Sequence, residues 1–140
     1  MKKASLLFLI ALLVSTIILD SCKKDEPTPE PTKSELLTNG NWTGIKAESY
    51  DDNILVSTEI ITEDVFEFKT DGSGIHYYQG AVDELFQWSF NTDKTSMYID
   101  YGNGDIWSLE IEALTQTQLT LSDTEEYNGV EYKDLIYLGR

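Results

Sequence analysis

Cysteine and histidine, two side chains suited to covalent, acid–base or metal chemistry, occur once each in this 140-residue chain. The only cysteine, Cys22, stands where an apolar run ends and a charged run begins, and the only histidine is His76. Oxygen donors gather in the segment DYGNGD at residues 100–105. Thiols are nucleophiles or attachment points, imidazoles are general bases or metal ligands, and oxygen clusters bind cations such as calcium. The surrounding segments decide which chemistry each group can perform.

Cys22 has the surroundings of an attachment site. Residues 6–19 form the apolar run LLFLIALLVSTIIL, which follows the cationic start MKK. The run is shorter than the roughly 20 residues of a membrane-spanning helix and has the length of the apolar region of a secretory signal. A lone cysteine in an exported protein cannot form an internal disulfide, so attachment is its other use. We predict a signal peptide over residues 1–21; the alternative for Cys22 is a free thiol beside an ordinary cleavage site.

The segment LDSC at residues 19–22 resembles the lipobox of bacterial lipoproteins, with a leucine three positions before the cysteine and a small residue directly before it. The resemblance implies that Cys22 is diacylated on sulfur, becomes the first residue after cleavage and is acylated again on its amine. One acyl chain binds a membrane reversibly, but each buried methylene adds about 0.8 kcal/mol, so two or three chains anchor stably. The expected partner is therefore a membrane, and the expected location is the outer membrane, held by a lipid anchor.

The face of that membrane stays open. Lys24-Asp25-Glu26 is similar to a short signal that carries some lipoproteins of Gram-negative bacteria to the outer surface. A solvated charge run in a linker is the alternative interpretation.

A tether separates the predicted anchor from the folded domain. Residues 22–35 contain all three prolines, and EPTPEPTKSE is poor in other apolar side chains, which favours an extended chain. The predicted domain, residues 36–140, has five basic and 20 acidic side chains. This charge repels phosphate backbones, so we expect no nucleic-acid partner.

Period-two alternation predicts an all-β domain. FQWSFN at residues 86–91 and WSLEIE at residues 107–112 alternate apolar and polar side chains, and the turn dipeptides DG or NG separate such runs. Strands are expected near residues 41–50, 59–69, 74–80, 84–91, 95–100, 105–113, 117–122 and 130–139, with a ninth if residues 54–61 pair separately. Short connections favour an up-and-down antiparallel meander, and about eight strands can close into a barrel.

The domain resembles the lipocalin-like domains of small Gram-negative bacterial lipoproteins. Gly40-Asn41-Trp42 stands before the first strand, where lipocalins carry Gly-x-Trp; the segment FKTDGSG at residues 68–74 is similar to a turn of these domains; and Arg140 follows the last strand. The resemblance implies that Arg140 stacks on Trp42 and closes one end of the barrel. It also implies a small apolar or aromatic ligand at the mouth of the barrel.

The remaining polar groups indicate no catalysis. His76 lacks partners at a recognisable spacing, so we interpret it as a strand residue at the barrel wall or mouth. Residues 100–105 lack the spacing of a calcium loop, and the acidic pairs, Asp83-Glu84 among them, are interpreted as solvated charges. We therefore expect no enzyme activity, metal or cofactor.

Two interpretations of function remain. The barrel holds a small ligand, or its core is full and its outer surface binds a glycan or an envelope protein; neither interpretation identifies ligand-binding residues. Six bulky aromatic side chains are expected to point inward, which favours a filled core or a shallow site. They are Phe66, Phe68, Phe86, Trp88, Phe90 and Trp107.

Overall fold

The alternating segments form antiparallel strands in a computed structural model that describes residues 29–104 and 106–140. Cys22, the predicted signal peptide and the first half of the predicted tether lie outside the described residues. One structural unit comprises Pro31–Arg140 and holds the helix and strands described below. Their bounds are α2 Lys33–Thr38, β1 Asn41–Asp51, β2 Ile54–Ile60, β3 Asp64–Phe68, β4 Ser73–Tyr78, β5 Ala81–Phe90, β6 Ser96–Asp100, β7 Ile106–Leu114, β8 Gln118–Tyr127 and β9 Val130–Gly139.

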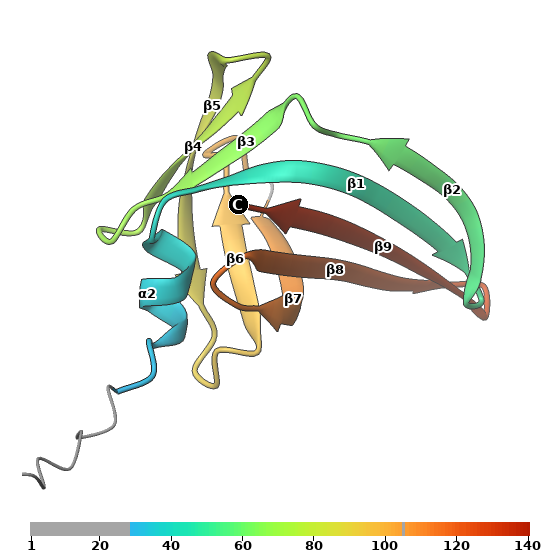
Figure 1. Ribbon diagram of the computed structural model, residues 1–140. Coiled ribbons are helices and arrows are strands. Elements are labelled where there is room, and N and C mark those ends of the chain that lie inside the picture. Colours follow the sequence, from blue (N-terminus) through green and yellow to red (C-terminus); the bar gives the residue numbers. More distant parts are fainter. Residues whose placement is uncertain (1–28, 105) are drawn as a thin grey trace, which may run out of the picture. The chain divides into compact units, whose positions relative to one another are not determined.

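The strands build a closed eight-stranded antiparallel barrel with one extra strand. Their order is β2-β1-β3-β4-β5-β6-β7-β8-β9, and β9 pairs again with β1 (Figure 1). Strand β1 therefore closes the ring, pairing with β3 through Asn41–Thr43 and with β9 along most of its length. The predicted all-β barrel is confirmed, and β2 is the strand that lies outside the ring.

The predicted single strand over residues 59–69 is wrong, and the nine-strand alternative is correct. Strand β2 pairs only with the second half of β1, whereas β3 pairs with its first three residues. Gly44 lies where β1 changes partner, and a Cβ there would come within 2.1 Å of the Ile61 carbonyl oxygen. The backbone thus needs a glycine at this crossing, and the chain breaks its strand at residues 61–63 to make it.

Beyond the barrel the sheet continues as a four-stranded extension, the flared sheet, made of β2, residues 47–51 of β1, residues 130–135 of β9 and residues 123–127 of β8. Strand β7 pairs with β8 only as far as Ser122, and no described strand pairs with the outer edge of β2. Figure 1 shows the β1–β2 and β8–β9 hairpins reaching away from the other strands. The two edges of the flared sheet are therefore free of strand partners in the described chain.

Helix α2 lies at the end of the barrel opposite the flared sheet. It begins three residues before the predicted domain start, because Thr32 and Glu35 form a capping box. Leu37 is fully buried, and its carbonyl oxygen accepts a hydrogen bond of 2.9 Å from the Trp42 indole nitrogen. No helix among the described residues is long and apolar enough to cross a membrane.

The expected inward aromatic phase is correct for all six side chains, but they are not equally buried. Phe68 and Phe86 are in the core, and Phe66, Trp88 and Phe90 are partly buried against it. Trp107, expected to be a core anchor, is 48% exposed. It is the second residue of β7 and lies at the mouth of the barrel, across from the flared sheet. The remaining core is aliphatic: Leu37, Met97, Ile99, Leu109, Leu119, Leu121 and Leu138 surround Trp42 and the buried phenylalanines.

Candidate ligand cavity

The core is not filled. A cavity of about 260 Å³ occupies the barrel on the side away from α2, and all eight barrel strands contribute to its wall. Apolar side chains dominate the lining, as is usual for small-molecule sites. The lining residues are Ala47, Ile61, Asp64, Phe66, Phe68, His76, Glu84, Ile99, Tyr101, Trp107, Leu109, Leu121, Ile136 and Leu138.

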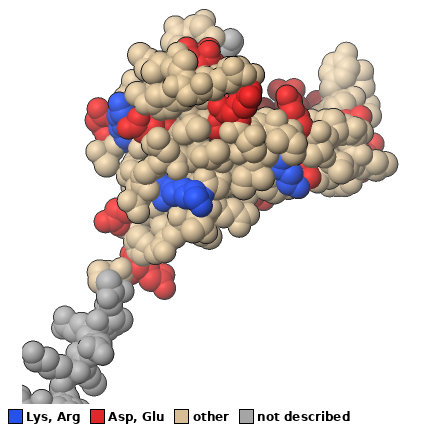
Figure 2. Space-filling model, turned by 45° about the horizontal axis from the view of Figure 1, so that its top comes forward, with Lys and Arg blue, Asp and Glu red and all other residues tan. Residues whose placement is uncertain are grey.

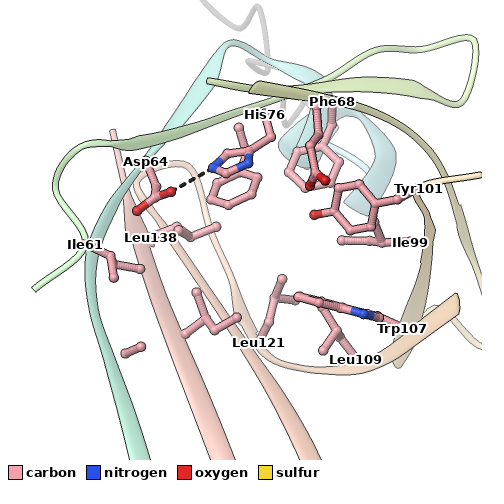
Figure 3. A pocket seen from close by; sticks show the side chains of 14 residues that line it. Ile61, Asp64, Phe68, His76, Ile99, Tyr101, Trp107, Leu109, Leu121 and Leu138 are labelled. Atoms are coloured by element: carbon pink, nitrogen blue, oxygen red, sulfur yellow. Dashed lines mark hydrogen bonds and ion pairs between the residues drawn. The ribbon is translucent and has the colours of Figure 1, made fainter. Parts of the chain in front are cut away.

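One wall of the cavity is polar and the facing wall is apolar. Figure 3 shows His76 and Asp64 on one side and Trp107, Leu109 and Leu121 on the other. The apolar wall follows from the alternation of β7 and β8, because every second residue of these strands faces the cavity and is apolar there. A ligand in this space would have an apolar body and could place one polar group near His76.

His76 is held between two carboxylates. Its Nε2 lies 2.7 Å from Asp64 Oδ1, and its Nδ1 lies 3.4 Å from Asp83 Oδ2. The imidazole also stacks on Phe66, with ring centroids 4.6 Å apart and an interplanar angle of 7°. The expected place of His76 in the barrel wall is correct, and its carboxylate partners lie 12 residues before it and seven residues after it, at spacings that no motif marks.

The partner Asp83 reaches His76 because of a β-bulge. In the β4–β5 ladder His76 pairs with Glu84 and Tyr77 pairs with Val82, so Asp83 is an extra residue. A bulge turns the side chain of its extra residue away from the regular alternation. Asp83-Glu84 is therefore part of the cavity rim, and the interpretation of this pair as merely solvated charges misses its contact with His76.

Tyr101 supplies a hydroxyl to the cavity. Figure 3 shows the phenol oxygen pointing into the space between His76 and Trp107. The ring makes edge-to-face contacts with Phe86 and Trp107, at centroid distances of 5.7 and 5.6 Å. Burial, followed by the negative charge of Glu84, raises the pKa of Tyr101 to about 12. The hydroxyl therefore stays protonated at neutral pH and can donate a hydrogen bond.

The lining carries acids without compensating lysine or arginine. Asp64 and Glu84 line the cavity, and His76 is the only basic side chain among the lining residues. Acidic side chains are also scattered over the outer face in Figure 2, with a few isolated basic ones. The field at the cavity disfavours an anionic head group such as a free carboxylate.

The structure brings together Trp42 and Arg140, the pair predicted to close one end of the barrel. The Arg140 guanidinium carbon lies 3.7 Å from the centre of the Trp42 ring. The guanidinium also donates hydrogen bonds to the carbonyl oxygens of Leu36, Leu37 and Gln116, at 2.6, 3.2 and 3.3 Å. This contact ties the last residue to α2 and the first strand at the end of the barrel opposite the cavity.

The acidic turn at residues 100–105 shows an ordinary structural role where it is described. Asp100 Oδ1 accepts a hydrogen bond of 2.7 Å from the backbone nitrogen of Gly102. That contact closes the turn after β6.

A second polar cluster lies on the outer face of β1 and β9. Glu48, only 8% exposed, accepts hydrogen bonds from Lys46 and from the Tyr50 hydroxyl, and the Lys46 ammonium lies 4.5 Å from the centre of the Tyr137 ring. The Lys46 hydrogen bond, and then that of Tyr137, lowers the pKa of Glu48 below its usual value. Burial, and then the hydrogen bond to Glu48, raises the pKa of Tyr137 to about 12.

Comparisons of the chain with protein-family models, with curated proteins and with solved structures found no match.

Proposed function

We propose that this protein is a membrane-anchored lipoprotein whose barrel is a non-catalytic, lipocalin-like binding domain for a small apolar or aromatic molecule at the cell envelope. The observation that carries the proposal is the half-open cavity of about 260 Å³ with an apolar body and a polar wall. A dry apolar cavity of about 150 Å³ binds benzene, so this volume suits an occupant of roughly ten non-hydrogen atoms.

The chemistry of the lining supports binding rather than catalysis. The lining residues include no cysteine, serine, threonine or lysine that could act as a nucleophile. Trp107 and Tyr101 present the kind of rigid aromatic surface that grips a planar ligand.

The binding proposal is tested by calorimetry on the full lipoprotein in nanodiscs of neutral lipid, titrated with 2-naphthol and with short alkanols. We expect saturable binding at one site per chain. Ala47 lines the cavity from β1, so Ala47→Phe fills part of it and should weaken binding at least tenfold. Ala81→Phe places the same side chain at an exposed position of β5 and should leave binding unchanged. Equal affinity in both variants would contradict a site inside the barrel.

The anchor is tested separately. Replacement of Cys22 by alanine should abolish incorporation of labelled fatty acid and leave an uncleaved precursor. Acyl labelling that persists in this variant would refute attachment at Cys22. Protease added to intact cells distinguishes the two membrane faces, because a surface-displayed domain is removed and a periplasmic one is protected.

The alternative, a protein- or glycan-interaction module, draws support from β2. Ile54, Val56 and Ile60 are 68%, 56% and 70% exposed, and the outer edge of the strand is unpaired in the described chain. Such an edge can accept an extended segment of another protein as an additional strand. Under this alternative, Val56→Lys would abolish the function of the protein in the cell, and Ala47→Phe would leave it unchanged. Under the cavity proposal, Ala47→Phe would abolish that function and Val56→Lys would leave it unchanged.

A further inference from the structure

We propose that His76, Asp83 and Glu84 form a binding site for a divalent transition-metal ion, of which zinc is the best fit, at the rim of the cavity. Each residue offers one donor atom, and the three atoms lie within 4.8 Å of one another. The proposal concerns this rim alone and does not depend on the ligand proposed for the cavity.

The distance between the first two donors already suits a tetrahedral ion. Two ligands bound at about 2.0–2.1 Å to a tetrahedral zinc ion are roughly 3.3–3.4 Å apart. His76 Nδ1 and Asp83 Oδ2 are separated by 3.4 Å. Glu84 must move its carboxylate inward by a side-chain rotation, which its exposed position allows.

The imidazole is oriented as metal-ligating histidines are. Asp64 can only accept a hydrogen bond when ionised, so a neutral His76 donates from Nε2 to Asp64 at 2.7 Å. Its Nδ1 lone pair then faces the Asp83 carboxylate. Two acceptors at this distance repel, and a cation between them removes the repulsion. A carboxylate behind a histidine that presents its other nitrogen to an ion is a recurrent arrangement in metal sites.

The β-bulge supplies the second and third donors. Adjacent residues of a regular strand point to opposite faces, so Asp83 and Glu84 could not both approach His76 in an unbroken β5. The extra residue at Asp83 brings both carboxylates to the same histidine. The stacked Phe66 ring limits the rotation of the imidazole from the other side.

The charge and the donor set select the class of ion. Asp64, Asp83 and Glu84 surround one imidazole, and no lysine or arginine of the described chain forms an ion pair with these acids. Imidazole together with carboxylates suits zinc and its neighbours, whereas calcium and magnesium prefer oxygen ligands alone. Three protein ligands leave a fourth position for water or for a donor atom of a bound molecule.

Titration of the untagged full lipoprotein with zinc chloride in metal-free buffer tests the proposal, with cobalt(II) absorption as a second readout of tetrahedral ligation. We expect one ion per chain and a dissociation constant that rises at least tenfold in His76→Gln, Asp83→Asn and Glu84→Gln. Asp64→Asn should weaken binding by about 10- to 100-fold, because it removes the group that orients His76. Asp123→Asn, the same charge change at an exposed site on β8, should leave the affinity unchanged.

Three results would overturn the inference. The first is absence of stoichiometric zinc binding. The second is an affinity unchanged in an Asp83→Asn variant whose circular-dichroism spectrum matches that of the wild type. The third is displacement of zinc by equimolar calcium, which would show that the imidazole takes no part.

Discussion

The contact between Arg140 and Trp42 gives the sharpest prediction about the fold, because it joins the last residue to the first strand. In Arg140→Ala, one cation–π contact at 3.7 Å and hydrogen bonds to three carbonyl oxygens are lost. The cation–π contact contributes about 0.5–1 kcal/mol at an exposed site. Each hydrogen bond contributes about 0.5–1.5 kcal/mol net, and the longer two belong at the low end.

The summed loss for Arg140→Ala is about 2 kcal/mol, reduced from the simple total because the guanidinium is exposed and its carbonyl partners can bind water instead. For a domain of this size, such a loss lowers the melting temperature by roughly 8–10 °C. Arg140→Lys keeps the charge but loses the planar fork, so we expect about half the effect.

Urea unfolding of the full chain, followed by circular dichroism, measures this loss. Lys69→Ala is the matched control, since it also removes one positive charge and should change the free energy of unfolding by less than about 0.5 kcal/mol. An Arg140→Ala variant no less stable than Lys69→Ala would refute the closing role of the pair.

Three further predictions concern other parts of the barrel. Trp88→Ala should lower the free energy of unfolding by about 3–5 kcal/mol, because Trp88 packs on the core and its indole nitrogen donates hydrogen bonds to two carbonyl oxygens. Trp107→Ala should lower it by at least about 2 kcal/mol less, because Trp107 is half-exposed at the mouth of the barrel. Equal losses in chemical denaturation would contradict the open mouth. Gly44→Ala should prevent closure or cost more than about 2 kcal/mol, because its Cβ meets the backbone oxygen of Ile61 at 2.1 Å; a native-like melting curve would contradict the crossing. The lowered pKa of Glu48 means that ionised Glu48 stabilises the fold above pH 4.5, the ordinary pKa of a glutamate, and that this stabilisation is lost as the pH falls through the lower folded-state pKa. The free energy of unfolding of Glu48→Gln should therefore change less with pH below 4.5 than that of the wild type. Parallel acid-denaturation curves would show that the Lys46 contact has no effect on stability.

The strand pattern of the sequence predicts the barrel well wherever both walls are present. Residues 86–91 alternate as expected, and Phe86 and Trp88 point inward as predicted. Alternation states which face of a strand a side chain occupies but not whether another strand lies opposite. Trp107 has the correct phase and is nevertheless half-exposed, because the flared sheet opens the wall across from it.

The rim of the candidate site could not be derived from regular alternation. Strand β5 carries an extra residue, which places Asp83 and Glu84 beside the same histidine. One sequence signal was available: Val82 and Leu85 are three apart, a spacing that breaks period two and indicates a bulge. The β3–β4 pairing brings His76 and Asp64 together, and the turn at residues 69–72 that joins the two strands sets the register of that pairing.

The central claim, a small molecule bound inside the barrel, is tested most directly by nuclear Overhauser effects between 2-naphthol and the methyl groups of isotopically labelled protein in nanodiscs. We predict contacts to the methyl groups of Leu109, Leu121 and Ile136, which line the cavity. The exposed methyl groups of Ile54 and Val56 on β2 should show none. Contacts confined to β2, with none to the three cavity residues, would contradict an internal site and favour a surface-binding module.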